Sequence, residues 1–347
     1  MSPRPLRLPA GLALVASAAL VLTGCSGSST AGSSGSTSAG AKKAVNISLV
    51  RQLSTGDYYE QWLSGAQAEA KKLGVNLSTL SADGDNAKQA TQLQQATATK
   101  PGAIIIDHGF TDSVKAPVKA ALDAKIPIVS FDVDTGNSGV TTVDQSDSTI
   151  AKDITDKLVS DTGGKAQIIY AYVAGYAPLD KRNAVWKTVK AANTGLEQVA
   201  QVGVVNDSTA AQTADQVKAA LRAHPGVTAI LAPYDEFAKG AVQAVDELKL
   251  NESVKVYGAD ISNADIAAIT ADGSPWVATA ATDPANVGAV TVRAAYLKAT
   301  GGSVDAAIEV PPALITQDVL RDKSITTVPD LVKAFPDLST PTIAAVK

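Results

Sequence analysis

Residues 126–134 read IPIVSFDVD, a short apolar run that contains a proline near its start and ends in two carboxylates. A continuous apolar run with these borders is typical of a central strand in a parallel sheet, buried on both faces. In open α/β sheets, ligands bind just beyond the carboxyl ends of such strands. Asp132 and Asp134 are therefore candidates for ligand binding.

The same pattern recurs along the chain. Further apolar runs end at Asp107, Asp235, Asp260 and Asp283. Because parallel strands bring their carboxyl ends to one edge of a sheet, we expect these side chains to gather beside a cleft. A carboxylate can accept two O–H hydrogen bonds at once, so the cleft is predicted to hold a hydroxyl-rich ligand.

The N-terminus has the features of a targeting segment. Arg4 and Arg7 precede an apolar segment, residues 10–22, that is too short to span a bilayer comfortably. Residues 22–25 then read LTGC and contain the only cysteine of the chain. This order resembles the lipobox of bacterial lipoproteins, which implies a signal peptide over residues 1–25 and a lipid anchor on Cys25. An ordinary secretory signal with an incidental cysteine is the alternative.

Composition bounds the rest of the chain. Residues 26–44 are rich in serine, glycine and alanine and are predicted to be a flexible tether. About 300 residues follow, enough for two lobes. Without Arg4 and Arg7, 28 basic residues stand against 34 acidic ones. No basic patch stands out, so nucleic acid is not expected as a partner.

Strands and helices alternate from residue 45 onward, which predicts a parallel sheet covered by helices on both faces. The pattern restarts at residue 166, after a predicted crossing near residues 144–147. Pro117 is expected in the first turn of its helix. Residues 308–315 are predicted to form one late strand, and the proline-rich tail is predicted to be irregular.

Five segments, in this order, resemble the type I periplasmic-binding-protein family, in particular the ribose-like sugar-binding lipoproteins of ABC importers. They are GAQAEA at 65–70, IPIV at 126–129, AHPGVTAI at 223–230, DE at 235–236 and VYGAD at 256–260. The resemblance implies two doubly wound α/β lobes joined by a three-strand hinge. The implied lobes are residues 45–145 with 283–311, and residues 146–282 with 312–347, the tail packing on the second lobe.

The resemblance also implies a ligand site. An aromatic pair, a first-lobe aspartate, an arginine and a second-lobe aspartate of the family match this sequence, and Tyr234 and Thr282 stand where the ribose branch has asparagine and glutamine. The predicted ligand-binding residues are Tyr58, Tyr59, Asp132, Asp134, Arg182, Tyr234, Asp235, Asp260 and Thr282. Val133 replaces an arginine that donates to the ligand in the ribose branch, so we expect weak binding of ribose.

Helix capping is the competing interpretation for the strand-end aspartates. Asp283 precedes Pro284, the usual order at a helix start, and is expected to cap. For Asp235 the capping and binding interpretations have equal weight. Asn263 is available to cap the helix after Asp260, which leaves Asp260 free for a ligand. As an edge residue, Asp260 is expected to contribute little to stability.

Three further side chains keep two interpretations. Arg182 is either a ligand contact or part of a solvated helix face, and Trp186 either lines the cleft or packs in the core. His108 follows Asp107, but the only other histidine is His224, so we predict no metal site. No nucleophile motif or phosphate-binding glycine loop is present, and we predict neither a cofactor nor catalysis.

The sequence therefore predicts a monomeric, lipid-anchored, extracytoplasmic solute-binding protein of an ABC importer. Its partners are expected to be a neutral sugar or polyol and the permease subunits in the membrane. Two alternatives remain at this point. One is a binding protein for a sensed or signalling small molecule, and the other is a surface glycosidase, which would use a pair of carboxylates.

Overall fold

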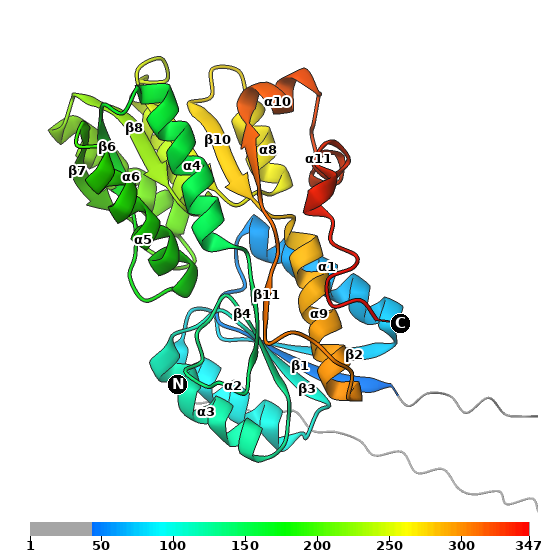
Figure 1. The fold of residues 1–347 in the computed structure, drawn as a ribbon. Coiled ribbons are helices and arrows are strands. Elements are labelled where there is room, and N and C mark those ends of the chain that lie inside the picture. The colour runs from blue at the N-terminus through cyan, green and yellow to red at the C-terminus, as the bar shows by residue number, and fades with distance from the viewer. Residues whose placement is uncertain (1–43, 347) are drawn as a thin grey trace, which may run out of the picture. The chain divides into compact units, whose positions relative to one another are not determined.

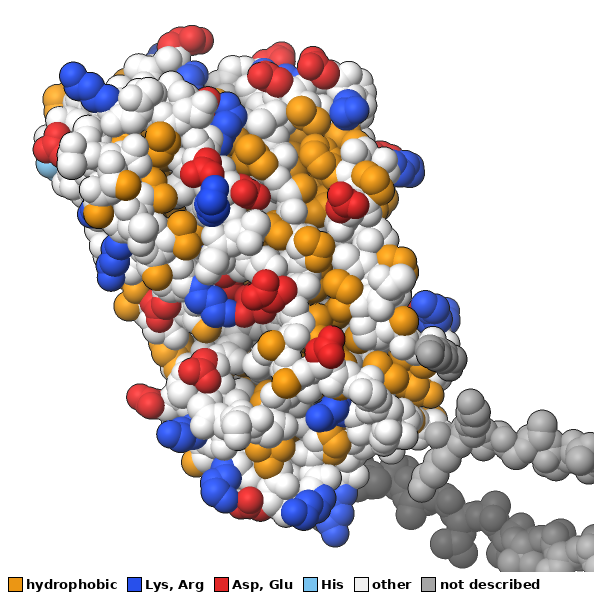
Figure 2. Space-filling model, viewed as in Figure 1, with side chains coloured by type: hydrophobic (Ala, Val, Ile, Leu, Met, Phe, Trp, Pro, Cys, Tyr) orange, Lys and Arg blue, Asp and Glu red, His pale blue; other side chains and the backbone are white. Residues whose placement is uncertain are grey.

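A computed structural model describes residues 44–346. The predicted signal peptide, Cys25 and all but the last residue of the predicted tether lie outside the described residues. Within the described residues, no helix is long and apolar enough to cross a membrane. On the face shown in Figure 2, lysine and arginine side chains lie between acidic ones and form no continuous basic surface.

The first lobe is built on a parallel six-stranded sheet in the order β11-β5-β4-β3-β1-β2. Its strands are β1 (Val45–Arg51), β2 (Val75–Ser81), β3 (Ala103–Asp107), β4 (Ile128–Phe131), β5 (Thr141–Asp144) and β11 (Ala307–Glu309). Its helices are α1 (Asp57–Leu73), α2 (Asn86–Ala98), α3 (Thr111–Asp123) and α9 (Pro284–Thr300). α1 packs against α9 and α2 against α3, so helices pair on the sheet as the alternating pattern predicts (Figure 1).

The α1–α9 pair shows why a glycine is needed at one position. A Cβ atom on Gly65 would lie 2.0 Å from the carbonyl oxygen of Ala285. Any larger residue would therefore push the two helices apart.

The second lobe has a six-stranded sheet in the order β12-β10-β9-β8-β6-β7. Its strands are β6 (Ala166–Ala171), β7 (Leu196–Val202), β8 (Val227–Ala232), β9 (Lys255–Ala259), β10 (Trp276–Ala281) and β12 (Ala313–Thr316). Its main helices are α4 (Asp147–Thr162), α5 (Ala177–Ala192), α6 (Thr209–Ala223), α7 (Asp235–Glu247) and α8 (Asn263–Thr270). Only the edge strand β12 is antiparallel to its neighbour. The prediction of two doubly wound α/β lobes is confirmed.

The chain passes between the two sheets after β5, after β10 and between β11 and β12 (Figure 1). The predicted single strand over residues 308–315 is wrong, because β11 and β12 belong to different sheets. Pro311 and Pro312 lie between them, and neither can donate a ladder hydrogen bond, which ends the first strand.

The tail is more regular than predicted. It contains α10 (Gln317–Asp322), α11 (Val328–Ala334) and a short 3-10 helix, η1 (Pro336–Leu338). The start of α11 is held to the second lobe, where the Asn263 side chain accepts from the Val328 amide. The last described residues contact the first lobe instead, because Arg293 of α9 donates to the carbonyls of Thr340 and Ile343. The expectation that the whole tail packs on the second lobe is therefore wrong.

Helix starts follow the local sequence with two exceptions. Asp283 caps α9 as predicted, accepting from the Ala285 amide at 3.0 Å. α8 is capped by Ser262 and not by Asn263. Pro117 lies inside α3, not in its first turn, because the helix begins at Thr111.

Candidate functional site

A pocket lies where both sheets end. Both lobes supply lining residues from strand ends and from the first turns of helices. They are Leu53, Tyr58, Tyr59, His108, Gln145, Tyr176, Pro178, Leu179, Arg182, Val205, Tyr234 and Asp260. Of the residues predicted from the sequence, the pocket is lined by Tyr58, Tyr59, Arg182, Tyr234 and Asp260.

Three strand-end residues at this edge have left-handed backbone conformations. The φ angles are 58° at His108, 50° at Asp132 and 70° at Asp260. For a residue with a side chain this conformation costs about 1–3 kcal/mol, and such strain clusters at functional sites. The same local turn therefore ends β3 and β4 of the first lobe and β9 of the second.

The second-lobe side of the pocket is a buried ion-pair network. Arg182 donates to both carboxylate oxygens of Asp260, at 2.9 and 3.0 Å, and to Asp147 at 2.9 Å. Arg182 is 2% exposed and Asp260 4%. Burial opposes the charge of Arg182, but the charges of Asp260 and Asp147 outweigh it and raise the pKa of the guanidinium.

This network overturns two expectations. Arg182 is not part of a solvated helix face, since it is buried and paired with Asp147 and Asp260. Asp260 is not a dispensable edge residue, because it is the counter-charge of a buried arginine. Trp186, one turn further along α5, packs in the core and donates to Gln198 at 3.0 Å, which excludes the cleft interpretation.

The first-lobe side contains a carboxylate that is only half satisfied. Asp132 does not itself line the pocket but lies beside two residues that do, Gln145 and His108. It is 3% exposed, and its Oδ2 accepts from Gln145 at 2.8 Å. Its Oδ1 and the buried hydroxyl of Tyr58 have no hydrogen-bond partner among the described residues. Burial, assisted by the charges of Asp147 and Asp144, raises the pKa of Asp132 well above its ordinary value.

Gln145 connects this carboxylate to the crossings between the lobes. Thr282, at the crossing after β10, donates to Gln145 Oε1 at 2.9 Å. Thr282 is fully buried and does not line the pocket, so it holds Gln145, which in turn holds Asp132. Gln145 was not predicted; its position directly after β5 is the signal that could have found it.

His108 is another polar pocket residue that was not predicted as a ligand contact. Its Nδ1 lies 2.6 Å from Asp107 Oδ1, and Arg51 donates to the second oxygen of Asp107 at 3.0 Å. Burial opposes the charge of Asp107, but these partners outweigh it and lower the pKa of the carboxyl. An ionised Asp107 accepts from Nδ1–H, which leaves Nε2 toward Asp132, 3.9 Å from Oδ2.

Two predicted site residues have other roles at this edge. Asp134 is exposed and accepts from the Gly136 amide at 2.8 Å, so it stabilises a turn outside the pocket. Asp235 is fully buried as the first residue of α7, accepts from the Glu236 amide, and does not line the pocket. Val133 packs in an apolar cluster and supplies no donor to the pocket, so the expectation of weak ribose binding stays a prediction.

One group of carboxylates in the described residues has the spacing of a metal site. Asp132, Asp144 and Asp147 each place one oxygen within 4.8 Å of the others. These side chains have protein partners already: Gln145 donates to Asp132, Lys181 to Asp144 and Arg182 to Asp147. A cation would have to compete with these bonds, and we assign no metal to the group.

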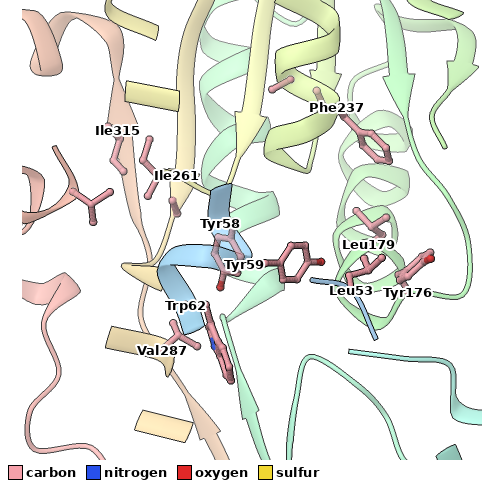
Figure 3. Close-up of a cluster of buried hydrophobic side chains, with 14 of the residues drawn as sticks. Leu53, Tyr58, Tyr59, Trp62, Tyr176, Leu179, Phe237, Ile261, Val287 and Ile315 are labelled. Carbon is pink, nitrogen blue, oxygen red and sulfur yellow. The ribbon is translucent and has the colours of Figure 1, made fainter. Parts of the chain in front are cut away.

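The opposite part of the pocket is apolar. Leu53 of the first lobe lies beside Tyr176 and Leu179 of the second, and the Tyr59 ring points toward them (Figure 3). Tyr176 is held by an edge-on contact with Phe110, with ring centroids 4.7 Å apart. The pocket thus has a charged side and an apolar side.

Comparisons with known proteins agree with this arrangement. Residues 47–303 match the family described as periplasmic binding protein domain. A solved 5-methylthioribose transporter solute-binding protein from Thermotoga lettingae, in complex with 5-methylthioribose, is 39% identical, with a TM-score of 0.86 over 87% of this chain and 96% of that one. A sugar ABC transporter structure from Yersinia enterocolitica is 30% identical, with a TM-score of 0.81 over 88% and 92% of the chains. The ribose import binding protein of Salmonella typhimurium is 28% identical over 78% of this chain and 90% of its own length.

Proposed function

This chain belongs to the periplasmic binding protein domain family, and we propose that it is the solute-binding protein of an ABC importer for a neutral monosaccharide or polyol. Its matched relatives serve sugar transport. The single observation that carries the proposal is the pair of unpartnered buried groups, Asp132 Oδ1 and the Tyr58 hydroxyl, beside the Arg182–Asp260 pair.

A buried polar atom without a partner costs about 1–3 kcal/mol. A hydroxyl of a sugar would give Asp132 Oδ1 its missing donor and Tyr58 its missing partner, so ligand binding removes the penalty. Asp132, Asp144 and Asp147 lie close together on this side. Added negative charge would raise their mutual repulsion, which favours a neutral ligand over a sugar acid.

The contacts of Asp260 argue against a glycosidase. Hydrolysis requires a pair of carboxyl groups that can exchange protons with the substrate. Both oxygens of Asp260 accept from Arg182. Neither oxygen is therefore free to exchange a proton with a substrate, and Asp260 is better suited to position an arginine than to act as an acid.

The lobes are proposed to be residues 45–145 with 283–311, and 146–282 with the first part of the tail. We further propose that the chain works outside the cell, anchored through lipid on Cys25, and delivers its ligand to the permease as a monomer. Cys25→Ser is expected to move the protein from the membrane to the soluble fraction. A variant that stays with the membrane would contradict the anchor.

A thermal-shift screen against neutral pentoses, hexoses, polyols and substituted pentoses tests the proposed function. A ligand that binds only the folded state, at about 100 times its Kd, adds about 2.7 kcal/mol of stability. For lobes of this size the melting temperature is expected to rise by roughly 5–10 °C. Absence of a shift with every neutral sugar and polyol, or turnover of a glycoside, would contradict the proposal.

A further inference from the structure

We propose that the ligand is a sugar with an apolar substituent, and that this substituent binds against Leu53, Tyr176, Leu179 and Val205. The inference rests on the proposed function and narrows its substrate class. The ligand class is a pentose or related neutral sugar in which one terminal hydroxyl is replaced by an alkyl or alkylthio group.

The first argument is the order of side chains along α5. Tyr176 directly precedes the helix, and Leu179 and Arg182 follow at successive intervals of three residues. Residues three apart lie on the same helix face, and all three line the pocket. At 1.5 Å per residue, Tyr176 and Arg182 are about 9 Å apart along the helix axis, and over this distance the side chains change from aromatic and aliphatic to charged. That span fits a sugar ring followed by a short substituent.

The second argument is that aliphatic side chains dominate the apolar part, where the Tyr59 hydroxyl points toward them (Figure 3). Leu53, Leu179 and Val205 have no polar side-chain atoms, and the Tyr176 ring faces the same part of the pocket. A sugar hydroxyl buried against Leu53, Leu179 and Val205 finds no partner on these three side chains, and a buried hydroxyl without a partner lowers affinity by about one to two orders of magnitude. Each buried methylene instead raises affinity about fourfold.

The third argument is that the apolar part is built rigidly. Phe110 of the first lobe holds the ring of Tyr176. Gly175 before it has a φ of 95°, and a Cβ there would lie 2.5 Å from the Phe110 ring. A glycine at this position lets the two aromatic side chains meet across the lobes, so the apolar surface forms when the lobes come together.

Calorimetry with two matched ligands tests the proposal. 5-Methylthioribose and ribose differ only in a methylthio group in place of a hydroxyl. We expect 5-methylthioribose to bind at least 30-fold more tightly to the wild type. Leu179→Asn is expected to reduce this preference at least tenfold, while Val185→Asn, on α5 but outside the pocket, is expected to leave it unchanged.

A second variant keeps the test decisive if Leu179→Asn does not fold. Val205→Thr adds a hydroxyl at a half-buried position with almost no change in shape, and is expected to reduce the preference severalfold. Equal or tighter binding of ribose, or of any unsubstituted sugar, would overturn this inference and leave the proposed function standing. Failure of every neutral sugar, substituted or not, would instead overturn the proposed function.

Discussion

Each lobe places one aspartate at a strand end near the pocket, Asp260 in its lining and Asp132 behind Gln145, and the two carboxylates are held differently. Asp132 ends β4 and Asp260 ends β9, both with a left-handed backbone and both buried. Asp260 has both oxygens satisfied by Arg182, whereas Asp132 has one oxygen held by Gln145 and the other without a partner. Similar strand ends therefore have different roles. Asp260 orders the site through its ion pair, whereas Asp132 lacks one hydrogen-bond partner when no ligand is bound.

This difference predicts which substitutions unfold the protein and which only weaken binding. Removing one member of a buried ion pair leaves the other charge buried without a counter-ion, which destabilises the fold. Removing a buried charge that already lacks a counter-ion takes away an unfavourable charge. The first effect appears in the protein without ligand, and the second appears mainly in the affinity.

Arg182→Met is expected to have the largest effect. It leaves Asp260 and Asp147 buried without their cation, which costs about 3–5 kcal/mol of the free energy of unfolding. Urea unfolding of the ligand-free protein measures the loss. Lys187→Met, at an exposed position of the same helix, is the control and should change little. A loss below 1 kcal/mol in Arg182→Met would show that the network is not structural.

Asp132→Asn is expected to act on binding. The amide oxygen can still accept from Gln145, and the unpartnered carboxylate oxygen is then replaced by an NH2 group, which donates and does not accept. Affinity for the ligand found in the screen should fall about 10- to 100-fold, which corresponds to about 1–3 kcal/mol. Ligand-free stability should stay the same or rise. Asp134→Asn, exposed two residues away, is the matched control for calorimetry, and an equal loss there would contradict the assignment.

Acidification is expected to give a smaller, stabilising effect. Burial raises the pKa of Asp147 from 3.8 to about 7; Arg182 opposes this and Asp144 adds to it. Between these two pKa values the folded state binds more protons than the unfolded state. Protonation of Asp147 therefore stabilises the fold at low pH, and this stabilisation is lost as the pH rises through 7. The free energy of unfolding should therefore increase by about 1–2 kcal/mol from pH 7.5 to 5.5.

Asp147→Asn tests the source of this pH dependence. The variant should flatten the pH profile, because the amide does not titrate but can still accept from Arg182. Asp156→Asn, at an exposed position of α4, should leave the slope intact. An unchanged slope in Asp147→Asn would assign the effect to another group, with Asp132 as the first to examine.

The fold followed from the sequence because alternating apolar runs and helical patterns define a doubly wound sheet locally. The left-handed strand ends were not predicted, since aspartate and histidine carry no local requirement for positive φ. The prediction of one strand over 308–315 failed because an apolar segment does not reveal that its two halves join different sheets.

The site was predictable where a side chain's position on its strand or helix fixes its direction. Arg182 and Asp260 were found this way, and their mutual bonding was not, because it depends on packing between α5 and β9. Val133 and Asp134 follow Asp132 directly, yet one turns into the core and the other to solvent. The backbone bend after β4, which directs these two side chains to different places, could not be predicted from the local sequence.

A crystal structure with the ligand identified by the screen tests the central claim most directly, since that claim concerns two particular atoms. The expected result is a ligand hydroxyl within hydrogen-bonding distance of Asp132 Oδ1 and of the Tyr58 hydroxyl, with the Arg182–Asp260 pair unchanged. A ligand bound in the pocket while both of these atoms remain without a ligand partner would contradict it.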